Sequence, residues 1–579
     1  MEIDHFSSTA LDFKGVEVCY EYDTIREVVF QGKHNFSEIE LMGEIDTLPT
    51  TDNRKGSNFF KDQNQQQLQE SKVDNLMLEE VNFDPDMQQK PTQLFHEITG
   101  LKKHRVAGSE AVEYNKQVPP SLTSLELLRN YGSRFKRVIE QNISTLSNTE
   151  TYLDHQKMST EEIIRVAGAS YVQYSAHWND SFCLSMHPYG LDLGSLSEEE
   201  TSEIELAQFL LAAAERVGCQ QYERARRLLL HCEWNSSASA SPVQRVIYHF
   251  SKALLEKIYK ETGRVTTFKG PENNKEIELI QKMDTCNSLI CHQKIPFNQV
   301  MQFTGIQAIV EHVASETKIH LIDLGLKFGV HCIALMQALV ERQDNCTVEI
   351  FKITAIGLNT CKATIEETGK RLTNFAESLS LPFSYDAVFV TDIAEISEYH
   401  FEIGEDEAVA VYSPYFLRSL VSRPRCLEKL MRVIRNIKPI IMIVLEVEAN
   451  HNSPSFAKRF IEALFFYSAF FDCLETCLKQ EIECRMTIEA ILSEGIKSIV
   501  AMEGEERTVR NVKIDVWRRF FARYRMVETA FSEPSLYHAE LVAKEFAFGK
   551  FCTVDKNGKC LILGWKGTPM HSISAWRFL

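Results

Sequence analysis

The amino-acid sequence predicts a doubly wound α/β fold, and three observations lead to this prediction. A buried strand, a glycine-containing turn and an apolar helix follow one another over Lys318–Arg342. From there to about residue 474, apolar runs of strand length alternate with helical patterns. Strands separated by helices of this length form parallel sheets with helices on both faces. Two short strands joined by a hairpin turn at Asn557-Gly558 then finish the sheet, as in Rossmann-like, methyltransferase-like folds.

Length and composition describe a large globular protein. The 579 residues are 44% hydrophobic, which is enough for a substantial core, and the formal net charge is −17. This charge argues against broad charge-driven binding to nucleic acid or to an anionic membrane surface, although it leaves room for a local basic face. The N-terminus is no signal peptide, and the apolar runs are too short to span a membrane. Fifteen cysteines without a framework indicate reduced thiols in the cytosol or nucleus.

The chain divides by pattern into three parts. Residues 1–120 show no sustained period and are predicted to be mostly disordered, because polar tracts surround only isolated apolar islands. Residues 121–200 are predicted to contain helices and a loop-rich connector, and Ser159 or Thr160 is expected to cap one of these helices. Residues 201–579 are predicted to form the main domain.

Residues 201–262 are predicted to form an α-helical cap. Apolar residues recur at helical spacing, Gly218 interrupts the first helix, and Ser241-Pro242 is a strong start signal for the third. No strict heptad persists, so packing within the chain is favoured over a dimer seam. Four leucines of these helices form the candidate partner face, namely Leu206, Leu210, Leu228 and Leu254.

The turn after the first strand of this βαβ unit is where α/β proteins often bind nucleotides or S-adenosylmethionine. Gly325 and Gly329 lie in this turn, but the side chains of residues 326–328 fill the close approach that a Gly-x-Gly turn allows. The second strand ends at Asn359 without an acid for the ribose hydroxyls. We therefore expect no bound cofactor, and Asp323 is predicted to be a turn or capping carboxylate rather than a catalytic one.

The remaining elements follow from the same periodicities. A helix over residues 297–314 precedes the central strand. Further strands are predicted over residues 348–357, 383–390, 408–412, 439–445, 551–554 and 560–565. Further helices are predicted over residues 362–380, 425–437, 455–474, 511–524 and 536–547.

Three other groups of residues are candidate functional sites. Cys473, Cys477 and Cys484 have no histidine to complete a zinc spacing, so we expect buried thiols and no metal site. His451 follows the end of a strand and suits either an active site or a loop tied by side-chain hydrogen bonds. The basic helix at Trp517, with arginines at positions 518, 519, 523 and 525, is a candidate for nucleic-acid contact, but a solvated helix face is favoured.

Several motifs, in order along the chain, resemble those of the plant GRAS family of transcriptional regulators. The leucine-rich helices resemble the first leucine-rich region (201–262), and Ile319-His320-Leu321-Ile322-Asp323 resembles the VHIID motif (region 281–346). Residues 361–395 take the place of the second leucine-rich region. Pro454, Phe466 and Tyr467 match the PFYRE region (404–500). The terminal region (501–579) resembles the SAW region, with motif residues Trp517, Trp565, Ser574, Ala575 and Trp576.

Two departures from the family pattern stand out. Where the family has an element close to RxERHE, this chain reads RTVRNVKID over residues 507–515, so Arg510 alone is carried over. The domain looks most similar to the gibberellin-responsive branch, yet the N-terminal segment lacks the DELLA and TVHYNP motifs of that branch. Hormone-controlled degradation is therefore not expected.

The resemblance implies a nuclear, non-enzymatic regulator of transcription that works through protein partners. The expected partners are DNA-binding transcription factors and other GRAS proteins, as homo- or heterodimers. Contact with DNA is expected to be indirect rather than direct, and no membrane is involved. The rival hypothesis is an S-adenosylmethionine-dependent methyltransferase or a small-molecule-binding protein on the same fold.

Overall fold

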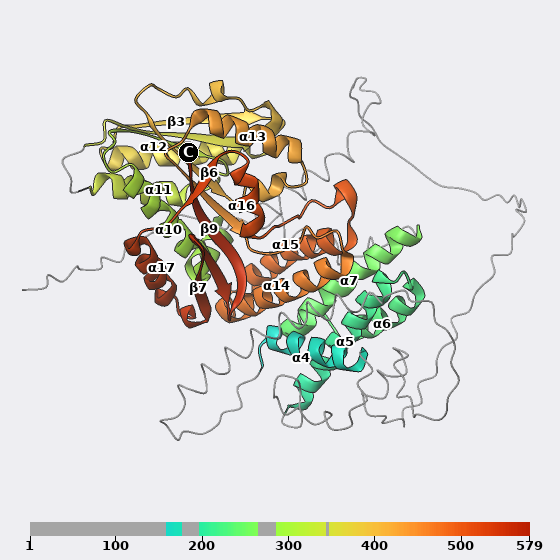
Figure 1. The fold of residues 1–579 in the computed structure, drawn as a ribbon. Coiled ribbons are helices and arrows are strands. Elements are labelled where there is room, and N and C mark those ends of the chain that lie inside the picture. The colour runs from blue at the N-terminus through green and yellow to red at the C-terminus, as the bar shows by residue number, and fades with distance from the viewer. Residues whose placement is uncertain (1–157, 176–195, 264–284, 343–346) are drawn as a thin grey trace, which may run out of the picture.

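The computed structural model describes residues 158–175, 196–263, 285–342 and 347–579 (Figure 1). The predictions for residues 1–157 and for most of the connector lie outside this part of the chain. The described residues contain one mixed sheet with the strand order β3-β2-β1-β4-β5-β9-β8-β7, and β6 pairs with β9.

The first five strands of this sheet are parallel. They are β1 (Lys318–Asp323), β2 (Ile350–Leu358), β3 (Phe383–Val390), β4 (Ala408–Pro414) and β5 (Ile441–Val447). The first strand, β1, lies in the middle of the sheet. The next two strands, β2 and β3, extend the sheet to one edge, and β4 and β5 extend it on the other side of β1. This is the doubly wound order that the alternation of strands and helices predicts, so the predicted fold class is confirmed.

Antiparallel strands complete the sheet beyond β5. They are β6 (Met526–Thr529), β7 (Cys552–Asn557), β8 (Cys560–Trp565) and β9 (Thr568–Phe578). The β7–β8 hairpin turns at Gly558, whose positive φ of 63° suits glycine. The last strand, β9, pairs with β5, β6 and β8.

Helices cover both faces of the sheet. The first face packs against α10 (Pro296–His312), α11 (Val330–Val340), α12 (Lys362–Ser378) and α14 (Phe456–Cys477), and α17 (Glu533–Glu545) lies beside α10. The second face packs against α13 (Pro424–Ile437) and α16 (Ile514–Ala522). Because side chains alternate along a strand, Leu321 belongs to the first core and Ile322 to the second.

A helical lobe stands beside this domain. Figure 1 shows α4 (Thr160–Ser175), α5 (Glu198–Gly218), α6 (Tyr222–Trp234) and α7 (Pro242–Thr262) grouped away from the sheet. The lobe packs on α14 and on α15 (Ile482–Ala501), and the short α9 (Thr285–Lys294) contacts α10 and α15. The lobe shares one continuous hydrophobic core with the first face of the sheet.

The predicted start signals act as helix caps. Ser241 Oγ accepts a hydrogen bond from Gln244 N (3.3 Å), with Pro242 at the first helical position of α7. At the start of α4, Ser159 Oγ accepts from Glu162 N (3.3 Å) while Ser159 N donates to the Glu162 carboxylate (2.7 Å). This reciprocal pair is a capping box, and it selects Ser159 over Thr160 as the cap.

The prediction missed some elements and shifted others. No assignment was made for α9, α15, β6 or β9. The last helix begins at Glu533 rather than at residue 536 because Ser532 caps it, accepting from Ser535 N (3.1 Å). The preceding helix begins at Ile514 rather than at residue 511, and α5 begins inside the predicted connector, at Glu198.

The candidate partner face on the lobe needs correction. The side chains of the four leucines are buried within the chain itself, with exposed fractions of 4% for Leu206, 0% for Leu210, 1% for Leu228 and 0% for Leu254. They belong to the first core and join the lobe helices to one another and to α14. They are therefore not an accessible partner face. They pack within the chain, as the absence of a strict heptad in the sequence indicated.

Among the described residues, no helix combines the length and the apolar character that a membrane crossing requires.

Gly329 is expected to be intolerant of a side chain for two reasons that can be separated. It adopts a left-handed φ of 70° at the N-terminus of α11, and a Cβ would lie 3.0 Å from Thr368 Cγ2 and 3.2 Å from Leu372 Cδ1. Gly263, which ends α7 with φ 67°, would have no atom within 4 Å of a Cβ. Gly263→Ala should therefore lower the free energy of unfolding by about 1 kcal/mol, from backbone strain alone.

Gly329→Ala should lower the free energy of unfolding by about 2–3 kcal/mol, because crowding adds to the strain. Urea unfolding of both variants of the full chain measures the difference. Equal losses in the two variants would show that the contacts with α12 are not tight.

Candidate functional site

The motif residues of the first strand are held inside the protein. Asp323 Oδ1 accepts a hydrogen bond from Gly325 N (2.9 Å), so Asp323 is a turn carboxylate. Its second oxygen accepts from His331 Nε2, and the ring of His331 stacks on Tyr412 with centroids 4.5 Å apart. Asp323, His331 and the adjacent Cys332 are all buried, and their donor atoms lie within 4.8 Å of one another. These three groups could hold a metal ion, but the Asp323–His331 hydrogen bond already satisfies two of them.

His320 is neutral and serves as a bridge between strands. Its Nδ1 donates to Glu407 (2.9 Å) and its Nε2 accepts from the hydroxyl of Thr354 (2.8 Å). Burial lowers the pKa of His320 to about 4, so the ring holds one proton at neutral pH. Ile319 and Leu321 face the first core, and neither is available to a ligand.

The chain packs closely around the turn after β1 and the end of β2. Leu326 of the Gly325–Gly329 turn is 1% exposed, and a Cβ at Gly325 would lie 3.2 Å from Pro414 O. At the end of β2, Ile365 Cδ1 of α12 lies 2.2 Å from the position of a Cβ on Gly357. Asn359 donates to Thr391 Oγ1 (3.1 Å) at the point where an acid would bind ribose. The glycines therefore make room for side chains of this chain.

Motif residues of the PFYRE region and of the terminal region converge on the loop between β5 and α14, here called the β5–α14 loop (Glu448–Ser455). Arg510 Nη1 donates to Asn452 Oδ1 (3.0 Å), and Pro454 O accepts from Arg459 Nη1 (3.1 Å). His451 in the same loop stacks on Tyr467, with centroids 6.0 Å apart, and meets Phe466 edge-on at 5.2 Å. Residues predicted from separate motifs thus share one structural role, which is to fix this loop.

A buried polar network extends from this loop to the sheet. His451 Nδ1 accepts from the Asn511 side chain (3.1 Å), and His451 N donates to Asn511 O (2.9 Å). Arg418 Nη1 also reaches Asn511 Oδ1 (3.5 Å), while Arg418 N donates to the Glu446 carboxyl (3.1 Å). The result is that the end of β5, the segment after β4 and the segment before α16 are tied together. The structure thus favours the tied-loop interpretation of His451.

Burial sets the protonation of this network. It raises the pKa of Glu446 to about 8, although the nearby Arg418 opposes the shift. Burial likewise lowers the pKa of His451 and of His571 to about 3. Tyr415 bonds to His571 Nδ1 (3.2 Å), which brings β9 into contact with the same region. The sheet end thus holds neutral histidines and, at neutral pH, a protonated Glu446.

Sequence reasoning missed Arg418, Glu446, Asn511 and His571. Arg418 and Glu446 gave a partial signal, as polar residues shortly after β4 and near the end of β5, whereas Asn511 precedes α16 and His571 lies within β9. Their pairing depends on segments far apart in the chain, which no spacing rule encodes.

The SAW residues hold the last strand in place. Ala575 faces the first core and Trp576 the second, where the Trp576 ring lies 4.7 Å from that of Phe521. Trp576 Nε1 donates to Ser574 Oγ (2.8 Å), and Trp565 Nε1 on β8 donates to Asp472 of α14 (2.7 Å). These positions are therefore structural in this chain.

The basic helix α16 offers few free cations. Trp517 is 2% exposed and belongs to the second core. Arg518 pairs with Glu528 (3.0 Å) and Asp515 (2.8 Å), and Arg523 pairs with Glu428 (2.8 Å). An aromatic side chain for stacking and two of the four arginines are thus already engaged, which supports the solvated-face interpretation.

The cysteines of α14 and α15 are buried, as predicted, and they lie in pairs. Cys473 Sγ lies 3.9 Å from Cys477 Sγ, and Cys484 Sγ lies 3.7 Å from Cys291 Sγ. Burial raises the pKa of the Cys473 thiol, so it stays protonated at neutral pH.

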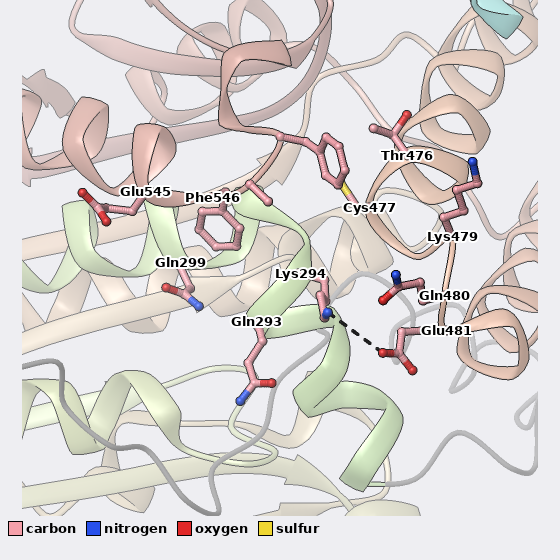
Figure 2. Close-up of a pocket in the computed structure, with 12 residues that line it drawn as sticks. Gln293, Lys294, Gln299, Thr476, Cys477, Lys479, Gln480, Glu481, Glu545 and Phe546 are labelled. Atoms are coloured by element: carbon pink, nitrogen blue, oxygen red, sulfur yellow. Dashed lines mark ion pairs between the residues drawn. The ribbon is translucent and has the colours of Figure 1, made fainter.

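A surface pocket of about 500 Å³ lies between α9, the link from α14 to α15, and the end of α17. Figure 2 shows Lys294 facing Glu481 across it, with 4.0 Å between the charged atoms. Phe546 and Cys477 provide apolar wall, and Gln293, Gln299 and Gln480 provide amides (Figure 2). None of the predicted motif residues lines this pocket.

Stability is expected to fall as pH rises through the titration of Glu446. The pKa of Glu446 is higher in the folded chain, so the folded state retains a proton that the unfolded state releases between about pH 5 and pH 8. Glu446→Gln removes this loss of stability at high pH. The free energy of unfolding of the variant, minus that of the unsubstituted chain, should therefore increase by on the order of a few kcal/mol from pH 5 to pH 8.

Urea unfolding at three pH values tests this expectation. Glu366→Gln, at an exposed position of α12 that pairs with Lys362, is the control and should show no such trend. A Glu446→Gln difference that does not change with pH would show that Glu446 is ionised in the folded chain.

Comparison with known proteins agrees with this geometry. The model of the GRAS domain family matches residues 206–577. DELLA protein RGL1 of Arabidopsis thaliana is 31% identical over 383 residues, which cover 66% of this chain and 71% of that protein. DELLA protein GAI1 of Vitis vinifera is 30% identical over 388 residues, which cover 66% of this chain and 63% of that protein.

A solved structure supports the fold. The crystal structure of SCL7 from Oryza sativa superposes with a TM-score of 0.56 at 23% identity, covering 64% of this chain and 99% of SCL7. At this identity the likeness concerns the fold alone. The family match extends over more than half of the sequence, and the chain therefore belongs to the GRAS domain family.

Proposed function

We propose that this chain is a nuclear co-regulator of transcription that acts by binding DNA-binding transcription factors or other GRAS proteins. Membership of the GRAS domain family, with DELLA relatives, supports a plant transcriptional regulator. The proposal goes beyond this membership in three respects, which are the nuclear site of action, the class of partner and indirect contact with DNA.

One structural observation carries the proposal. Near the turn after β1 and the end of β2, where a methyltransferase binds its cofactor, Leu326 and Ile365 are packed into the hydrophobic core, and β2 ends without an acid for ribose. This packing supports a scaffold. The chain lacks both the Gly-x-Gly turn that lets a cofactor approach the backbone and the acid that binds the ribose of a cofactor. The motif residues stabilise the scaffold, so partner contacts are expected on its surface.

Recruitment to a promoter tests the regulatory function. The full chain is fused to a heterologous DNA-binding domain and expressed in plant cells with a reporter that carries the matching sites. Reporter output should change several-fold relative to the DNA-binding domain alone, and the unfused chain should leave it unchanged. An output equal to that of the DNA-binding domain alone would contradict the proposal.

Calorimetric titration of the full chain with S-adenosylmethionine tests the rival function. We expect no saturable heat, because the turn after β1 lacks a Gly-x-Gly approach and β2 ends without an acid for the ribose hydroxyls. Saturable binding at micromolar concentration would instead support a methyltransferase or a small-molecule-binding protein.

A further inference from the structure

Four cations converge where the helical lobe meets the β5–α14 loop. They are Lys257 of α7, Arg459 of α14, and Arg507 and Arg510 of the segment after α15. Three are nearly inaccessible, with exposed fractions of 6% for Lys257, 1% for Arg459 and 5% for Arg507, and Arg510 is half-buried. Burying a positive charge is costly unless a negative group compensates it.

Few carboxylates compensate these cations. Glu503 pairs with Lys257 (3.1 Å) and with Arg459, and Glu261 also pairs with Lys257 (3.3 Å). Among the described residues, neither Arg507 nor Arg510 forms an ion pair with a carboxylate. Arg507 and Arg510 therefore lack a paired carboxylate, although Glu503 acts on both of them electrostatically.

Arg507 has one free edge. Its Nη1 donates to Ser453 O (3.3 Å), but its Nε is buried and has no hydrogen-bond partner among the described residues, and its Nη2 bonds to none of them. The Nε–Nη2 edge of a guanidinium is planar and can bind an oxyanion through two parallel hydrogen bonds. Burial, followed by the nearby Arg459 and Arg510, lowers the pKa of Arg507 to about 10, although Glu503 opposes the shift.

The loop that Arg507 contacts leads into the N-terminus of a long helix. Arg507 contacts the loop two residues before Ser455, which caps the 22-residue helix α14. The first backbone N–H groups of a helix have no partner within the helix and attract anions. Arginine side chains and a helix N-terminus thus point to the same kind of ligand.

We propose that Arg507 and Arg510 form a binding site for a dianionic phosphate group, either free phosphate or a small phosphate monoester. One phosphate group can accept charge-assisted hydrogen bonds from both arginines, which have no paired carboxylate among the described residues. The site goes beyond the proposed regulatory function and does not depend on it.

Thermal unfolding and calorimetry of the full chain test the site. At constant ionic strength, inorganic phosphate should raise the melting temperature saturably, and sodium chloride or acetate should not. Arg510→Gln and Arg507→Gln should each weaken phosphate binding by about tenfold or more, the loss expected for a charge-assisted hydrogen bond. Arg523→Gln removes an equal charge from α16 and should bind phosphate as the unsubstituted chain does.

Two comparisons separate the site from a purely structural role. In phosphate-free buffer, Arg507→Gln should not lower the melting temperature, because it removes a cation that Arg459 and Arg510 repel. If Arg507→Gln fails to fold, the half-buried Arg510→Gln carries the test. Phosphoserine and inorganic phosphate, titrated separately, distinguish a monoester ligand from free phosphate. Equal stabilisation by acetate, or undiminished phosphate binding in both variants, would overturn the proposal.

Discussion

The last strand of the chain holds the sheet together. β9 pairs with the final parallel strand, β5, and also with β6 and β8, so it joins the doubly wound part to the antiparallel part. Its side chains alternate between the two cores, with Ile573 and Ala575 on one face and Trp576 on the other. Without β9, the edge of β5 would expose unpaired backbone groups and both cores would lose a wall. The described fold is therefore complete only when its final residues have joined the sheet.

The sequence was most informative where a pattern is local. The period of the strands and helices gave the fold class, and Ser241 and Ser159 marked helix starts that the structure contains. The sequence was least informative where a residue's role depends on distant segments. β9 was missed because its side chains are buried on both faces, so it shows no alternation. The lobe leucines were offered as a partner face because periodicity shows that residues share a side, not what covers that side.

The candidate site shows the same division. Asp323 could be assigned to a turn from the sequence, since its partner Gly325 is only two residues away. The network of Glu446, Arg418 and Asn511 could not, because its members come from three separated segments. The network lies at the sheet end where α/β enzymes place their chemistry. Its polar groups bond to one another there and tie the ends of the strands together.

The first described helix, α4, lies before residue 206, where the family match begins, yet it is fastened to the far end of the chain. Asp472 of α14 accepts from Trp565 Nε1 (2.7 Å) and from Thr160 N (3.3 Å), and it also pairs with Lys566 (2.8 Å). Glu161 is bonded to Thr568 at the start of β9. A fragment cut at the family boundary would remove one of the donors to Asp472 and the partner of the Thr568 hydroxyl, and it would uncover the core beneath α4. The independently stable unit is therefore longer than the homologous one, and fragments for expression should start before Met158.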